Sequence, residues 1–194
     1  MLRTEHRIQK IRDVISRRQP LLTVVLENIH DPHNVSAVIR TCDAVGVLRV
    51  ELLYTQEGFP RIGKKSSSSA NKWMERRKHT SVDGCYEKLR RDGFRIFATR
   101  LTPDATSLYN LDLTGPVALV FGNEHRGVSD KAAAGADRTF QIPMVGMIQS
   151  LNVSVAAAVA LYEAFRQRRA AGMYDEPTIG LEEQERLLHE WADR

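Results

Sequence analysis

The sequence predicts an α/β protein with a mostly parallel sheet and helices on both of its faces. Continuously apolar segments alternate with helical ones, which is typical of parallel strands buried on both faces. The 194 residues suit one domain with short appendages. Hydrophobic residues make up 42% of the chain and charged residues 27%, as in ordinary globular proteins.

The first half of the chain alternates between helices and strands. In residues 3–18 isoleucines recur at helical spacing and basic residues occupy the opposite face, which predicts an amphipathic helix. The β-branched segment 21–29 is predicted to be a buried strand. Asn34 is interpreted as the N-cap of a helix that closes at Gly46, and residues 49–55 as the second strand.

The second half opens with a basic, serine-rich region. Residues 61–78 are too polar to pack by themselves, so we predict a mobile loop that orders on its substrate. The remaining predicted elements are a helix at 82–92, strands at 94–100 and 116–122, a short helix capped by Ser129, a strand at 138–144, and helices at 152–171 and 181–194.

Composition and motifs exclude several classes of protein. The N-terminus has no apolar run typical of a signal peptide, and Pro143 and Gly146 interrupt the longest uncharged stretch, which therefore does not span a membrane. Cys42 and Cys85 lie far apart without a CxxC pair, which indicates a reducing, cytoplasmic setting and argues against a zinc site. A P-loop is disfavoured because Lys65 occupies its Ser/Thr position.

Positive charge is gathered in three clusters. The net charge of +4 and pI near 9.2 favour a polyanionic partner. One cluster lies in 3–18, one in 61–78 around Trp73, and one in 166–169. Any one of them could be a solvated face, but three together favour nucleic acid. The candidate RNA-binding residues are Arg7, Arg12, Arg18, Lys64, Lys72, Arg166 and Arg168.

Arg40 breaks a local rule. It lies in a helix that is apolar nearly all round, which predicts burial. A buried guanidinium needs a partner. One reading is an ion pair with Asp43 or Glu27, and the other is a clamp on a phosphate or on a developing alkoxide.

Two further polar segments follow apolar strands. In residues 122–129, GNEHRGVS, Glu124 is a candidate base, orienting residue or cap, and the glycines permit close approach of a ligand. Ser150 and Asn152 stand before a long helix, so one is expected to cap it and leave the other for substrate.

These three segments resemble a known family. NIHDPHNVSAVIRTCDAVGV, LVFGNEHRGVS and IPMVGMIQSLNVSVAAAVALYEA are similar to the three motifs of the SPOUT-superfamily RNA ribose 2′-O-methyltransferases. The basic N-terminal helix and the arginine-bearing tail resemble the TrmH branch, the tRNA guanosine 2′-O-methyltransferases. The resemblance covers nearly the whole chain.

The resemblance implies a fold, a methyl donor and an assembly. It implies a C-terminal trefoil knot that holds S-adenosylmethionine, without a metal, and a homodimer in which Arg40 completes the other subunit's site. The motif residues are Asn34, Arg40, Glu124, Ser150 and Asn152. The residues that match donor-pocket positions are Thr99, Gly122, Ile142 and Leu151. The branch also implies guanosine 18 of the tRNA D-loop as the target.

The predicted organisation leaves some alternatives open. Residues 1–19 are interpreted as a basic RNA-binding extension, 20–172 as the methyltransferase domain and 173–194 as a helical tail. The family assigns activation of the hydroxyl to the residue matching Arg40, whereas an alkoxide or phosphate clamp suits an arginine better. A ribosomal RNA ribose methyltransferase and a non-catalytic RNA-binding relative are the alternative functions.

Overall fold

Seven strands form one sheet in the computed structural model, which describes residues 4–60 and 70–194. Every pairing between neighbouring strands is parallel, and the strand order is β3-β2-β1-β6-β4-β7-β5. The strands are β1 (Gln19–Glu27), β2 (Val47–Leu53), β3 (Glu75–His79), β4 (Arg95–Thr99), β5 (Thr106–Ser107), β6 (Val117–Phe121) and β7 (Arg138–Gln141).

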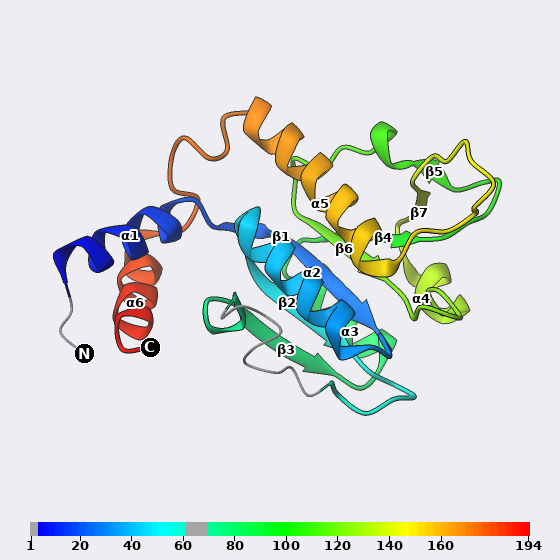
Figure 1. Cartoon of the computed structure of the whole chain (residues 1–194), viewed down its shortest axis with the longest axis horizontal. Helices are drawn as coiled ribbons and strands as arrows, with labels where there is room; N and C mark the ends of the chain where they lie inside the picture. The colour runs from blue at the N-terminus through cyan, green and yellow to red at the C-terminus, as the bar shows by residue number, and fades with distance from the viewer. Residues whose placement is uncertain (1–3, 61–69) are drawn as a thin grey trace.

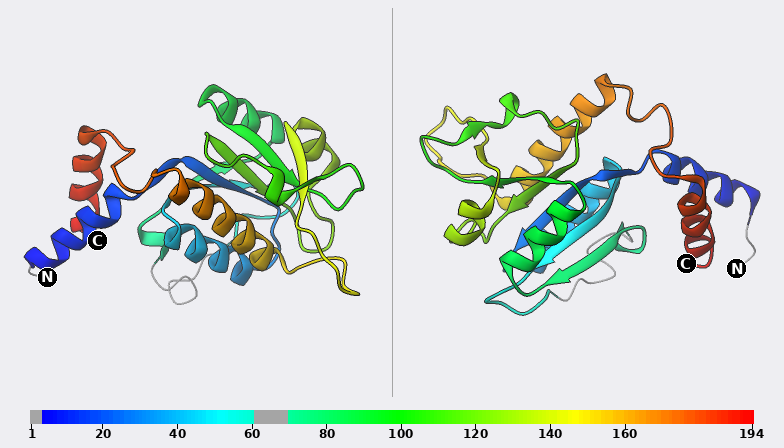
Figure 2. Two further views of the ribbon diagram at one scale, coloured as in Figure 1. Left: turned by 90° about the horizontal axis from the view of Figure 1, so that it is seen from above. Right: turned by 180° about the vertical axis from the view of Figure 1, so that it is seen from behind.

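Helices cover both faces of this sheet. α2 (Pro32–Ala44) and α5 (Val153–Ala170) pack together on one face, and α3 (Val82–Arg91) and α4 (Asp130–Gly135) lie on the other (Figures 1 and 2). Two apolar cores result, one on each face of the sheet. The predicted α/β class is confirmed. Within the described ranges, no helix is long and apolar enough to cross a membrane.

The two ends of the chain meet away from the sheet. α1 (Glu5–Ser16) and α6 (Leu181–Ala192) lie side by side beyond the start of β1 (Figure 1). A third, small core forms where Ile11 and Ile15 of α1 and Leu187 and Trp191 of α6 pack with Ile179 and with Leu48 of β2. Together these two helices form the α1–α6 unit.

The structure corrects the predicted elements in two places. Residues 75–79 were predicted to be loop but form the edge strand β3, whose charged side chains find partners, since Glu75 pairs with Arg49 and His79 with Glu51. The predicted strand at 138–144 ends at Gln141, before a proline-containing loop. The short elements β5, η1 (Ala70–Lys72) and η2 (Leu108–Asn110) were not predicted. Residues 61–69 of the basic region, with Lys64 and Lys65, lie outside the described residues.

Candidate functional site

A cavity of about 780 Å³ opens at the carboxyl ends of β4, β6 and β7. Its lining comes from residues 99–102, 121–128, 140–142 and 150–153, with Asp130, Met144 and Ala156. Ligands of open α/β sheets bind beyond the carboxyl ends of strands, and this volume lies in the range of small-molecule sites. The cavity is therefore the candidate ligand site.

All four predicted donor-pocket residues line this cavity, namely Thr99, Gly122, Ile142 and Leu151. Gly122 is sterically required, because an added Cβ would stand 2.1 Å from the carbonyl carbon of Gly127. Gly127 itself has a φ of +69°, a conformation that favours glycine. The loop after β6 thus folds back on the strand end, where Gly122 packs against the backbone of Gly127 and Val128, and all three residues line the cavity.

A hydrogen-bonded network joins the three polar segments at the cavity. Glu124 accepts from the side-chain Nδ2 of Asn34 at 2.9 Å and from the backbone N–H groups of His30 and Asp31 at 2.9 and 3.1 Å. Asn152 Nδ2 donates to Asn34 Oδ1 at 3.2 Å. Residues from the ends of β1 and β6 and from the start of α5 are therefore held in one arrangement.

This network fixes the protonation state of Glu124. Partial burial alone raises the pKa of this carboxyl, but the hydrogen bonds from Asn34 and from the backbone of His30 and Asp31 outweigh it and lower the pKa below 4.5. Glu124 is thus ionised at neutral pH. A carboxylate with a lowered pKa is a weak base, so this geometry favours the orienting role over the base.

Asn34 takes part in the network because it does not cap α2. The prediction that Asn34 is the N-cap was wrong, since the helix begins at Pro32 and the Asp31 side chain accepts from His33 N at 2.8 Å. Proline is favoured in the first turn, where its missing N–H has no partner to lose. The cap thereby moves three residues upstream and leaves the Asn34 amide to the network.

Asn152 and Ser150 divide the two expected tasks between them. Asn152 caps α5, since its Oδ1 accepts from Ser154 N at 2.8 Å. Ser150 is exposed, lines the cavity and makes no hydrogen bond to another described residue. The prediction that one of the pair caps the helix is confirmed.

Arg40 lies elsewhere than predicted. The helix buries Val35, Val38, Ile39 and Cys42, but Arg40 is exposed, so the prediction of burial within one chain was wrong. Neither expected ion pair forms, because Asp43 pairs with Arg18 and Glu27 accepts from Ser129. Arg40 has no polar partner among the described residues and does not line the cavity. A single chain therefore presents this guanidinium outward.

Two candidate RNA-binding residues are buried. Arg168 is 0% exposed and its guanidinium donates to the carbonyls of Leu113, Leu21 and Gly115 and to Gln19 Oε1. Burial lowers its pKa to about 10, so it stays cationic at pH 7.

Arg18 is 1% exposed, and its Nη2 lies 2.5 Å from Asp43 Oδ1. The prediction that Arg18 and Arg168 contact RNA was wrong, because neither guanidinium reaches the surface. A basic cluster in the sequence does not reveal which of its members fold inward.

The other basic candidates remain accessible. Arg12 and Lys72 are exposed and Arg7 is half-buried. Arg166 is 68% exposed and pairs with Glu163 across one helical turn. Lys64 lies outside the described residues.

Two asparagines at the strand ends were missed by sequence reasoning. Asn28 adopts a left-handed φ of +50° after β1, and its Oδ1 accepts from Thr55 N at 2.9 Å. Asn123 Nδ2 donates to the Asn28 carbonyl at 2.7 Å and so ties β6 to β1. An Asn directly after an apolar strand was the available signal, since Asn tolerates this conformation.

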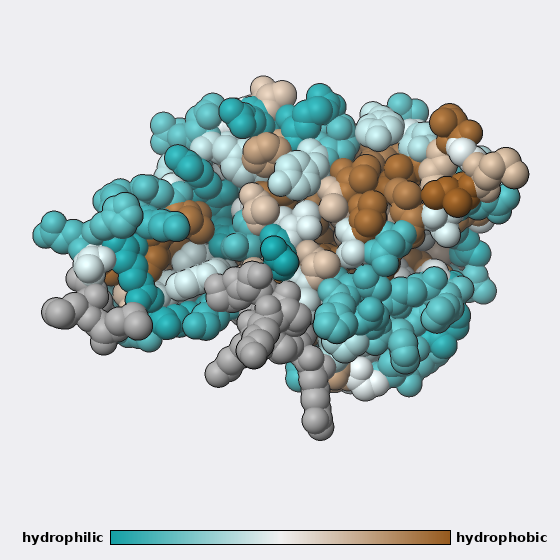
Figure 3. Space-filling view, viewed as in Figure 1, coloured by the Kyte–Doolittle hydropathy of each residue, from teal (hydrophilic) through white to brown (hydrophobic). Residues whose placement is uncertain are grey.

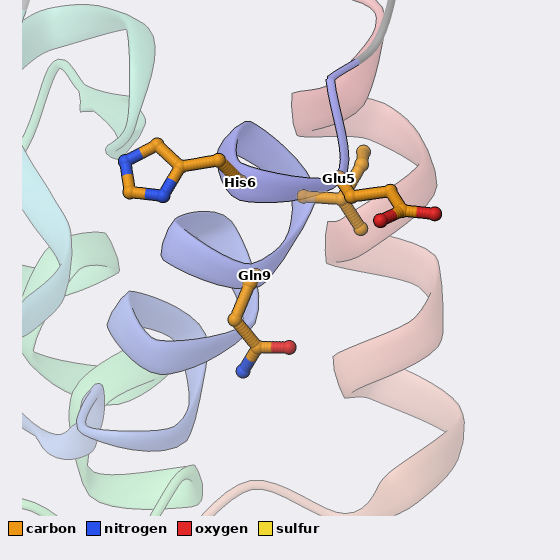
Figure 4. Close-up of a pocket in the computed structure, with 4 residues that line it drawn as sticks. Glu5, His6 and Gln9 are labelled. Atoms are coloured by element: carbon orange, nitrogen blue, oxygen red, sulfur yellow. The ribbon is translucent and has the colours of Figure 1, made fainter.

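A second hollow, of about 510 Å³, lies on the first turns of α1. It is lined by Glu5, His6, Ile8 and Gln9. Figure 4 shows Glu5 and His6 pointing to different sides of the helix, so no set of polar groups converges there. Over residues 4–60 and 70–194, no group of three or more His, Cys, Asp or Glu side chains could hold a metal ion.

Comparison with known proteins points to one family. Residues 21–162 match the SpoU rRNA Methylase family, and residues 166–192 match the C-terminal SpoU rRNA methylase region. The tRNA (guanosine(18)-2′-O)-methyltransferase of Thermus thermophilus is 48% identical over 97% of each chain.

Two solved structures are also similar. The TrmH/SpoU tRNA modifying enzyme of A. aeolicus superposes with a TM-score of 0.92 at 39% identity, over 97% of this chain and 96% of that one. The SpoU methyltransferase AviRb of Streptomyces viridochromogenes, in complex with AdoMet, gives a TM-score of 0.70 at 28% identity, over 81% and 62% of the two chains.

Proposed function

The chain belongs to the SpoU rRNA Methylase family, and from this premise we propose that it methylates the ribose 2′-hydroxyl of guanosine 18 in tRNA. The family match agrees with the resemblance seen in the three motifs. The enzyme is a methyltransferase of the TrmH type. The observation that carries the proposal is the meeting of all three motifs at one cavity through the Asn34–Glu124–Asn152 network.

S-adenosylmethionine fits the cavity as methyl donor. Gly122 lines the cavity, and Ile142 and Leu151 add apolar lining. The similar AviRb structure contains AdoMet. When bound, the donor supplies a methyl group already activated on a sulfonium. The protein therefore has to orient the reactants and assist loss of the hydroxyl proton.

The polar residues of the site divide these tasks. Asn34, Asn152 and the ionised Glu124 form a rigid set beside the free Ser150 hydroxyl. We assign them the positioning of the ribose within hydrogen-bond reach. Arg40 is assigned the stabilisation of the alkoxide or of a neighbouring phosphate, because an arginine stays protonated.

We propose that the chain forms a homodimer in which Arg40 of each copy completes the site of the other. Within one chain the cavity lacks Arg40, which points outward from α2. Exposed apolar side chains, including Val145, Met147 and Val155, lie on α5 and in the loop that follows β7, where Figure 3 shows an apolar patch. Such a face suits an isologous interface, in which each copy completes the other's site.

We also propose the C-terminal trefoil knot that the resemblance implies. The end of α5 is held between two separate segments, since Gln167 and Arg168 bond to residues 111–115 on one side and Arg168 bonds to the start of β1 on the other. A helix threaded through the loop that precedes β6 would be enclosed in this way, which supports the proposed knot. In such a knot, the segment that passes through the loop would itself supply part of the lining of the methyl-donor cavity.

The proposed division into an extension at 1–19, a catalytic domain at 20–172 and a tail at 173–194 gives RNA a surface beyond the cavity. The α1–α6 unit joins the first and last of these parts. We propose that Arg7, Arg12, Lys72, Lys64 and Arg166 contact RNA phosphates. A tRNA substrate and two unpaired cysteines suit the cytoplasm.

The test is incubation with unmodified tRNA transcript and S-adenosylmethionine labelled in its methyl group, followed by digestion to nucleosides. Label is expected in 2′-O-methylguanosine, and a transcript with adenosine at position 18 should lose it. Arg40→Ala should abolish turnover while donor binding persists. Label that appears only with ribosomal RNA would move the substrate, and donor binding without transfer to any RNA would contradict catalysis.

A further inference from the structure

The α1–α6 unit is joined to the catalytic domain at a junction centred on Arg18. This residue lies between α1 and β1, and its guanidinium is 1% exposed. Nη2 lies 2.5 Å from Asp43 Oδ1, and Nη1 donates to the Val47 carbonyl at 3.0 Å. Both partners belong to the catalytic domain, at the end of α2 and the start of β2.

The opposite side of Arg18 faces the α1–α6 unit. Its guanidinium carbon lies 5.1 Å from the centre of the Trp191 ring of α6, a cation–π distance. Thr178, in the segment leading to α6, donates from Oγ1 to the Arg18 carbonyl at 2.8 Å. One buried cation is thus shared between the two parts of the molecule.

A third segment reaches the same point. Trp73 lies within the basic region 61–78 and packs edge-on against Trp191, with ring centres 5.5 Å apart. Arg186 of α6 also pairs with Glu75 of β3 at 3.1 Å. The junction therefore connects the segments that carry two of the basic clusters, in α1 and around Trp73, with α6.

The junction also meets the catalytic site through one rigid element. α2 carries Asp43 near its end, Asn34 of the cavity network near its start, and Arg40 between them. Because all three residues belong to one helix of 13 residues, their positions relative to one another are fixed. The α1–α6 unit is therefore held, through Arg18, against the same helix that carries the site residues.

We propose that Arg18, Asp43 and Trp191 are positioning residues that hold the α1–α6 unit at the angle and distance needed for a full-length tRNA to touch this unit while its target ribose enters the cavity. This proposal rests on the proposed function and goes beyond it. Their loss should weaken the use of large RNA and spare the chemistry on small RNA.

The test compares two substrates, intact tRNA and a stem-loop that carries the target guanosine but is too short to reach α1 and α6. For Asp43→Asn, KM for tRNA should rise about tenfold, as when one or two phosphate contacts are lost. Its kcat on tRNA, its kinetics on the stem-loop and donor binding should stay within twofold of wild type. Asp83→Asn, which removes an exposed ion pair with Lys131, is the matched control and should change neither substrate.

Tryptophan emission gives a readout independent of methylation. The chain has two tryptophans, Trp73 and Trp191, and both lie at the junction. Asp43→Asn should shift their emission to the red with far-UV circular dichroism unchanged, whereas Asp83→Asn should not. If Asp43→Asn does not fold, Trp191→Phe tests the same contact, because it keeps an apolar ring and removes the indole face.

The outcomes separate this proposal from the proposed function. Equal losses on tRNA and stem-loop, or no loss on either, would overturn the positioning role. If the wild-type protein methylates neither RNA, filter binding of the same two RNAs decides. Weakened binding of tRNA alone by the Asp43 variant would then support the junction while the assigned chemistry fails.

Discussion

Asn34 Nδ2 lies 2.9 Å from Glu124 Oε1, although 90 residues separate them in the chain. This contact joins the first turn of α2 to the loop after β6. It depends on Asp31 taking the cap of α2, because a capping Asn34 would turn its side chain towards its own helix. The relationship between these two residues therefore sets the shape of the proposed ribose site.

Glu124→Gln should lower kcat by about 10², the effect typical of losing one preorganised polar group. In the variant, an amide NH₂ group would replace one carboxylate oxygen of Glu124. It would then face a donor, either the N–H groups of His30 and Asp31 or the side-chain amide of Asn34, and two donors repel each other. Single-turnover rates with saturating donor and tRNA measure the effect. Equal rates for wild type and variant would remove Glu124 from the orienting set.

Glu124 should also contribute to stability against acid. Its folded pKa is lowered, so its contribution is complete above the ordinary value of 4.5 and is lost as pH falls through the folded value. Thermal melts of wild type and Glu124→Gln between pH 3 and about 7 measure this. The difference in Tm should be largest near neutral pH and shrink in acid, and a difference that grows in acid would contradict the lowered pKa.

Asp31→Ala and Asn34→Ala should separate folding from activity. Asp31 caps α2, so its loss should lower the free energy of unfolding by about 1 kcal/mol. Asn34 does not cap the helix, so its loss should lower turnover more than stability. Urea unfolding and initial rates on the same two proteins give both quantities. A larger stability loss for Asn34→Ala would restore it as the cap.

Arg168→Gln should destabilise the fold by about 3 kcal/mol, because hydrogen bonds to a buried charge are among the stronger ones. The four oxygens that Arg168 contacts tie α5 to β1 and to residues 113–115. Arg166→Ala is the control at the surface, where its exposed ion pair with Glu163 should contribute little to stability. That variant should instead reduce the salt dependence of tRNA binding. An unchanged unfolding curve for Arg168→Gln would contradict its buried role.

The sequence predicted the sheet well because buried parallel strands are apolar throughout. Segments 21–29 and 116–122 needed no tertiary information, and Ser129 was placed correctly as a helix cap. One of Ser150 and Asn152 was expected to cap α5, and the structure assigns this cap to Asn152. The edge strand β3 was missed because its charged residues are paired by distant partners, such as Arg49 with Glu75. No local pattern reports a partner 26 residues away.

The sequence predicted which residues line the cavity, but it did not predict which of the arginines are buried and which are exposed. The cavity positions follow from strand ends, which the sequence locates. The exposure of Arg40 and the burial of Arg18 and Arg168 depend on which helix face meets the sheet and on contacts made far along the chain. A count of basic residues therefore overestimates the RNA-binding surface.

The most direct test of the account is subunit mixing. Arg40→Ala and Asn152→Ala should each be inactive alone, because one removes the clamp and the other the network of the cavity. After unfolding and refolding together, mixed dimers should contain one site with Asn152 from one chain and Arg40 from the other. About a quarter of wild-type transfer of labelled methyl into 2′-O-methylguanosine of tRNA is then expected, as random pairing in an isologous dimer requires. No activity in the mixture, with each variant folded and the wild type recovering under the same treatment, would contradict a site completed by the second copy.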